Sequence, residues 1–158
     1  MWVDGLDSPS TRAPGVGTRP VVLYVAGDHS SRVVFTRIAR RWKQLRLVVA
    51  DGARDGARIA LVRRPRLVVM DGRLPDVPAD LAVSRLRQGP VPPDVPIVVL
   101  HDDDTPDARS RFVRAGASAY LTKPLNVASV DRTVGALLEF PVALAPPLPH
   151  GHKERSRR

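Results

Sequence analysis

Short apolar segments alternate with longer segments of helical periodicity along most of this chain. The apolar segments are rich in Val, Leu and Ile, as buried strands are, and the longer segments repeat their apolar residues every three or four positions. Repeated strand–helix–strand crossovers build a parallel sheet with helices on both faces. The pattern therefore predicts a doubly wound α/β fold of five βα units. The expected strands are Val21–Val25, Leu45–Ala50, Leu67–Met70, Ile97–Leu100 and Ala119–Leu121.

The helices are predicted from capping residues and from the faces that their apolar residues share. Ser30 or Ser31 can cap the first helix, and Val34, Ile38 and Trp42 then fall on one buried side of it. Such faces would cover the two sides of the sheet. The other expected helices carry Ala53, Ala57 and Leu61; Leu81 to Arg87; Phe112 and Ala115 after a Thr105-Pro106 start; and Val127, Val130, Val134 and Leu137 after an Asn126 cap.

The two ends of the chain lack this alternation. We expect residues 1–19 to be a disordered leader, residues 20–140 to form the domain and residues 141–158 to be a disordered basic tail. No apolar segment approaches the roughly 20 residues that span a bilayer, and cysteine is absent. We therefore expect a cytoplasmic protein that does not contact a membrane.

The charge of the chain raises the question of a nucleic-acid partner. The formal net charge is +9 and comes mostly from arginine. These arginines are spread over every predicted helix, and the basic run from Lys153 to Arg158 has no aromatic residues between its charges for base stacking. We therefore regard nucleic-acid binding as unlikely and place it third, behind the two functions that the strand ends suggest below.

Candidate chemistry lies where the predicted strands end. Ligands of open parallel sheets bind beyond the carboxyl ends of the strands, and this places Asp71, His101 and Lys123 at one edge. A carboxylate directly after a buried strand is costly unless a positive charge compensates it, and Lys123 can supply that charge. Such a pair can form an acyl phosphate, with the lysine neutralising phosphoryl oxygens. The alternative is a buried ion pair that only fixes two strand ends.

Several segments carry a resemblance to a known family. The chain resembles the receiver domains of bacterial response regulators, the phosphoacceptors of two-component signalling, over about residues 20–140. The most specific stretch is Ala-Gly-Ala-Ser-Ala-Tyr-Leu-Thr-Lys-Pro. The resemblance rests on residues 21–25, on Leu67 to Asp71 followed by Leu74-Pro75-Asp76, on residues 96–100 and on residues 115–124.

The resemblance implies a strand order and roles for particular residues. It implies a flavodoxin-like five-stranded parallel sheet of order 2-1-3-4-5, with Asp71 as the phosphoacceptor and Lys123 as the lysine that contacts the phosphoryl group. Tyr120 matches the aromatic switch position, and Thr122 and His101 lie at the strand ends near the phosphate. The family also implies Mg²⁺ and a phosphohistidine donor.

The chain departs from the family at the acidic pair that helps to hold Mg²⁺. Those positions are Ala26 and Gly27, and only Asp28 follows, one step later. Mg²⁺ requires oxygen ligands, so a site made by Asp28 and Asp71 would be weak, and the offset can point Asp28 away. The switch hydroxyl after the fourth strand is replaced by His101, which can still donate a hydrogen bond to phosphate.

These observations lead to a first hypothesis and an alternative. The first is a stand-alone receiver domain, not an enzyme, that accepts a phosphoryl group on Asp71 from a histidine kinase or phosphotransfer protein and acts on a downstream signalling protein. The alternative is a pseudo-receiver, an interaction module without phosphotransfer, which the replacements at positions 26, 27 and 101 motivate.

Overall fold

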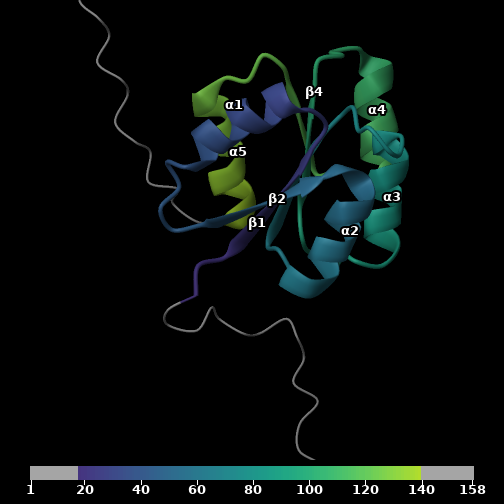
Figure 1. Cartoon of the computed structure of the whole chain (residues 1–158). Coiled ribbons are helices and arrows are strands. Elements are labelled where there is room, and N and C mark those ends of the chain that lie inside the picture. The colour runs from purple at the N-terminus through teal and green to yellow at the C-terminus, as the bar shows by residue number, and fades with distance from the viewer. Residues whose placement is uncertain (1–17, 140–158) are drawn as a thin grey trace, which may run out of the picture.

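The structure, a computed structural model, describes residues 18–139 and contains the predicted sheet. Five parallel strands lie in the order β2-β1-β3-β4-β5, which confirms both the doubly wound class and the strand order (Figure 1). The predicted leader and tail lie almost entirely outside the described residues. The elements are β1 (Val21–Ala26), α1 (His29–Ala39), β2 (Arg46–Asp51), α2 (Gly52–Arg63), β3 (Leu67–Asp71), α3 (Ala79–Gln88), β4 (Ile97–His101), α4 (Pro106–Ala115), β5 (Ala119–Thr122) and α5 (Val127–Leu138).

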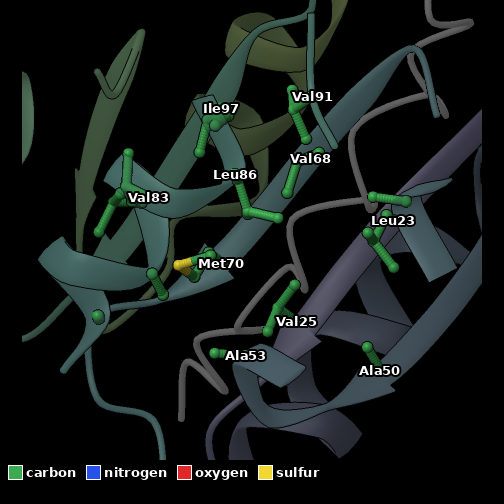
Figure 2. Close-up of a cluster of buried hydrophobic side chains, with 14 of the residues drawn as sticks. Leu23, Val25, Ala50, Ala53, Val68, Met70, Val83, Leu86, Val91 and Ile97 are labelled. Carbon is green, nitrogen blue, oxygen red and sulfur yellow. The ribbon is translucent and has the colours of Figure 1, made fainter. Parts of the chain in front are cut away.

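Helices cover both faces of the sheet, α1 and α5 on one side and α2, α3 and α4 on the other (Figure 1). Alternate residues of each strand point to opposite faces, so each strand contributes to two cores. In β1, Val22 and Tyr24 face α1 and α5, whereas Leu23 and Val25 face α2 and α3, in the core cluster that Figure 2 shows. This alternation fixes which face of the sheet each residue at a strand end adopts.

Two helix starts are as predicted, and one differs. Thr105 caps α4 ahead of Pro106, and Asn126 caps α5, each accepting a backbone N–H three residues later. The expected Ser30 or Ser31 cap of α1 is wrong, because Asp28 caps that helix by accepting the N–H of Ser31 at 2.8 Å. The three residues are all good caps, so their identity alone could not select the first.

The buried faces of α1 and α2 agree with the predicted ones only in part, since Ile38, Trp42 and Ala53 are buried as expected but other residues are not. In α1 the buried residues include Phe35 and Ile38, whereas Val34 is half exposed. In α2 the buried line runs through Gly56 and Ala60, and Leu61 is exposed. Glycine at 56 allows this, since a Cβ there would lie 2.8 Å from a methyl of Val25. A helix of small residues on its sheet side therefore lies closer to the sheet than its larger apolar residues suggested.

A buried carboxylate in α5 binds the segment that follows α1 on one face of the sheet. Asp131 is 3% exposed and accepts hydrogen bonds from the Arg41 guanidinium and the Trp42 indole N–H, both at 2.8 Å. A buried carboxylate is stable only with such partners. The three residues tie the last helix to the first.

Within residues 18–139, no helix combines the length and the apolar character that crossing a bilayer requires.

Candidate functional site

Asp71 ends β3 and is almost completely buried at 1% exposure. Its Oδ1 atom lies 3.1 Å from the ammonium of Lys123, which follows β5. Its Oδ2 atom accepts two hydrogen bonds, from the hydroxyl of Tyr24 at 2.8 Å and from the backbone N–H of Gly27 at 2.6 Å. The predicted convergence of Asp71 and Lys123 is thus present in the structure, and the cost of burying the carboxylate is offset by one charge and two donors.

The two carboxylate oxygens differ in what they can do. Oδ1 is buried and accepts no hydrogen bond, because the Lys123 ammonium lies within ion-pair distance but outside hydrogen-bond geometry. Lys123 instead donates to the hydroxyl of Ser31 at 2.9 Å and keeps about a quarter of its side chain exposed. Oδ1 therefore retains free lone pairs next to a partly exposed positive charge, which is the arrangement of a nucleophile with an adjacent electrostatic stabiliser.

Tyr24 fixes Oδ2 from the interior of the sheet. Its ring is fully buried and packs against Phe35 with centroids 4.3 Å apart. Burial, and then the charge of Asp71, raise the pKa of the Tyr24 hydroxyl far above its usual value. The phenol is therefore protonated and acts as a donor to the carboxylate at any physiological pH.

Asp28 belongs to α1 rather than to the carboxylate site. Its Oδ1 accepts the Ser31 N–H at 2.8 Å, and its Oδ2 accepts the Ser31 hydroxyl at 3.1 Å. The hydrogen bond from the Ser31 backbone is the main cause that holds the pKa of Asp28 below its usual value. This capping role uses both oxygens of the side chain that was predicted to share a metal with Asp71.

The donor set around Asp71 does not fit Mg²⁺. Ala26 is buried and has no side-chain oxygen, and Gly27 has no room for a side chain, since a Cβ there would lie 1.9 Å from the carbonyl oxygen of Arg73. Among residues 18–139, no group of three or more His, Cys, Asp or Glu side chains is placed to hold a metal ion. Mg²⁺ needs near-octahedral oxygen ligation, and here the oxygens of Asp71 face protein donors instead.

His101 ends β4 and faces the α4 side of the sheet. It is 5% exposed, and its Nδ1 accepts the N–H of Asp103 at 2.8 Å, so the ring is neutral with its proton on Nε2. Burial lowers the pKa of His101, which agrees with that tautomer. The 3.5 Å approach of Nδ1 to Asp102 is consequently no ion pair. The ring rests on the backbone of Gly72, where a Cβ would lie 1.7 Å from the ring.

Tyr120 and Thr122 contact the β4–α4 segment. The Tyr120 hydroxyl donates to the carbonyl oxygen of Asp103. The Thr122 hydroxyl lies between the Arg109 guanidinium at 3.1 Å and the Asp104 carboxylate at 3.2 Å. Arg109 also lies over the Tyr120 ring, 5.0 Å from its centroid. Tyr120 and Thr122, two of the three residues predicted at the phosphate-binding and switch positions, therefore make these contacts on the α4 side.

The structure thus divides the predicted site between two faces of the sheet. Asp71 and Lys123 converge on the α1 side of the sheet edge. His101, Tyr120 and Phe112 form a cluster of three rings on the α4 side, with centroids 5.7 to 6.2 Å apart. The two groups meet only at the strand ends.

Sequence reasoning missed Tyr24, the Gly27 amide and Ser31 as partners of this site. Tyr24 was assigned to an apolar strand without a role. Strand parity carried the missing signal, because Tyr24 pairs in register with Val69, two residues before Asp71 on the same face.

Comparison with known proteins identifies the family. Residues 22–134 match the response regulator receiver domain. The chain is 28% identical over 120 residues to the probable transcriptional regulatory protein TcrX of Mycobacterium tuberculosis, covering 76% of this chain and 50% of that protein. It is 25% identical over 113 residues to the two-component response regulator ORR3 of Oryza sativa subsp. indica, covering 72% of this chain and 86% of that one. The chain spans about half of TcrX and most of ORR3.

A solved structure shows the same fold. The receiver domain of the sensor histidine kinase PA1611 from Pseudomonas aeruginosa PAO1, which has a magnesium ion coordinated in its active-site cleft, superposes with a TM-score of 0.70 at 23% identity, covering 77% of this chain and 99% of that one. The buried aspartate at the end of β3, the lysine after β5 and the 2-1-3-4-5 sheet are thus found in a chain that belongs to the response regulator receiver domain family of two-component signalling.

Proposed function

We propose that this domain accepts a phosphoryl group on Asp71 from the phosphohistidine of a histidine kinase or phosphotransfer protein. The observation that supports this most is the Asp71 carboxylate itself, buried at the end of β3 with its Oδ1 free of hydrogen bonds and 3.1 Å from Lys123. A carboxylate that served only to pair with a lysine would gain stability from direct hydrogen bonds to it, and Oδ1 has none.

In the proposed step, a lone pair of Asp71 Oδ1 attacks the phosphorus atom. An O–P bond forms, the P–N bond of the phosphohistidine breaks, and its electrons return to the imidazole, which takes up a proton. Lys123 moves from Oδ1 toward the phosphoryl oxygens and neutralises part of their charge. Tyr24 and Gly27 keep their hydrogen bonds to Oδ2, which becomes the carbonyl oxygen of the acyl phosphate.

The output of this step would be read on the α4 and β5 side of the domain by a downstream signalling protein. His101 contacts the backbone of Gly72, next to Asp71, and its ring packs near Tyr120. A displacement at Asp71 would reach the surface of α4 through these contacts. The domain acts as a phosphoryl acceptor rather than as an enzyme, alone or within a longer protein, and a cytoplasmic location stays a prediction.

Intact mass after incubation with phosphoramidate or a cognate kinase tests the proposal. We expect one phosphoryl adduct on the wild type, none on Asp71→Asn, and an unchanged adduct on Asp94→Asn, which removes an exposed carboxylate far from β3 in sequence. An adduct that persists in Asp71→Asn would refute Asp71 as the acceptor.

A second candidate is a pseudo-receiver that uses the same fold for protein interaction only. The observation in its favour is that Oδ1 and Oδ2 both face protein groups and that Asp71 is 1% exposed, so a donor can reach it only after Lys123 moves. Beryllium fluoride, which mimics a bound phosphoryl group, separates the two candidates. NMR shifts around Asp71 and Tyr120 on its addition would exclude the pseudo-receiver.

A further inference from the structure

The site around Asp71 has protein donors where a divalent cation would need open oxygens. Oδ2 accepts hydrogen bonds from the Tyr24 hydroxyl and the Gly27 amide, and Oδ1 faces the Lys123 ammonium. A cation bound to Oδ2 would have to displace one of its two hydrogen-bond donors, and a cation bound to Oδ1 would lie against the positive charge of Lys123. Each is held in place, so the displacement would cost free energy.

The Tyr24 hydroxyl is the least movable of the three. Its ring is fully buried inside β1 and packs on Phe35, which packs in turn on Trp42 at 5.8 Å. Rotating the phenol away from Asp71 would break both its packing on Phe35 and its hydrogen bond to Oδ2. Tyr24 is consequently a fixed donor rather than a side chain that happens to reach the carboxylate.

The two residues that end and follow β1, Ala26 and Gly27, carry no polar side chain beside the phenol. Ala26 lies on the same face of β1 as Tyr24, two residues closer to the strand end, and presents only a methyl group. The backbone of residue 27 is closed against Arg73, so no carboxylate can be added there without moving the segment after β3. The small side chain of Ala26 and the phenol of Tyr24 therefore act together, because the hydroxyl of Tyr24 occupies the space beside Oδ2.

We propose that the Tyr24 hydroxyl and the Gly27 amide hold the Asp71 carboxylate in place of a divalent cation, so that phosphoryl acceptance at Asp71 proceeds without Mg²⁺. This rests on the proposed function for its transfer step, whereas the absence of cation binding can be measured by itself. Tyr24 is a positioning residue here, because it orients Oδ1 toward the donor and does not react.

The cation itself is the first probe. The thermal unfolding midpoint of the wild type is measured in EDTA and in about 10 mM MgCl₂ at matched ionic strength, where a millimolar site would raise it by about 5 °C. We expect no rise. A rise that Asp71→Asn abolishes would overturn the proposal.

The second measurement is the rate of adduct formation with phosphoramidate, in EDTA and in MgCl₂. We expect the same rate in both, whereas a rate that Mg²⁺ raises by about tenfold or more would overturn the inference and leave the proposed function intact. An adduct in neither condition would overturn the proposed function and the transfer step with it, and the unfolding measurement would still report on the cation.

The double variant Tyr24→Phe, Ala26→Asp tests whether Tyr24 is the cause. It removes the phenolic donor and places a carboxylate on the same face, and we expect its midpoint and its rate of acceptance to become dependent on Mg²⁺. Ala26→Asp alone, with the phenol in place, is the matched control and should respond less. A folded double variant that stays insensitive to Mg²⁺ would contradict the role of Tyr24, and if it does not fold, the two wild-type comparisons still decide.

Discussion

Replacing Lys123 by methionine keeps most of the aliphatic side chain and removes the ammonium beside Asp71. At an effective dielectric constant of about 20, unit charges 3.1 Å apart attract each other by about 5 kcal/mol. Desolvation of the lysine and the ordering of its side chain offset part of this attraction, and its partial exposure weakens it further, so we expect a net coupling of about 2 kcal/mol between Lys123 and Asp71.

A double-mutant cycle of urea unfolding measures this coupling. The cycle uses Lys123→Met, Asp71→Asn and the combination, with Lys43→Met as the control for removing an exposed lysine. We expect Lys123→Met alone to lower the free energy of unfolding by about 2 kcal/mol, since it leaves a buried carboxylate without a counter-charge. The same change should cost much less when residue 71 is already asparagine. A coupling below about 0.5 kcal/mol would refute the electrostatic account of the pair.

Three further predictions concern other parts of the domain. Asp131→Ala should lower the free energy of unfolding by about 3 kcal/mol, because it leaves a partly buried guanidinium and a buried indole N–H without their acceptor. A urea unfolding curve with no loss of stability would contradict this. Burial depresses the pKa of His101 in the folded state, so the stability that neutral His101 contributes is complete above a pH of about 6.5 and decreases as the pH falls below that value. The unfolding midpoint of His101→Asn should therefore depend less on pH below about 6.5 than the midpoint of the wild type. An equal pH dependence in the two proteins would exclude His101 as its source. Gly27→Ala should lower the unfolding midpoint, because a Cβ would lie 1.9 Å from the Arg73 carbonyl oxygen; a midpoint equal to that of the wild type would show that the segment after β3 yields freely.

The strands could be predicted because each is a short run of apolar residues followed by a helical segment, and such runs are typical of a buried parallel sheet. Their carboxyl ends then had to meet at one edge, so the pairing of Asp71 with Lys123 followed from fold class and the order of residues. The buried line of α2 could not be read in the same way, because glycine and alanine on its sheet side, rather than Leu61, set how closely it packs.

The polar partners of Asp71 were harder to predict for a different reason. A tyrosine in an apolar strand usually contributes its ring to the core, and only the register with β3 shows that the hydroxyl of Tyr24 reaches a carboxylate. Asp28 was likewise ambiguous, because an aspartate after a strand can ligate a metal or cap the next helix. The hydrogen bond from the Ser31 backbone decides in favour of the cap.

The position of His101 has a consequence for how the two sides of the sheet communicate. Asp71 points toward α1 and α5, whereas the His101 ring points toward α4, so the β-sheet lies between the two side chains. The two sides come into contact at the carboxyl edge of the sheet, where the His101 ring packs against the backbone of Gly72. A displacement of the carboxylate can reach α4 only around that edge, through atoms in van der Waals contact. The absence of a side chain at Gly72 and the size of the ring at position 101 therefore decide how much of the displacement is transmitted.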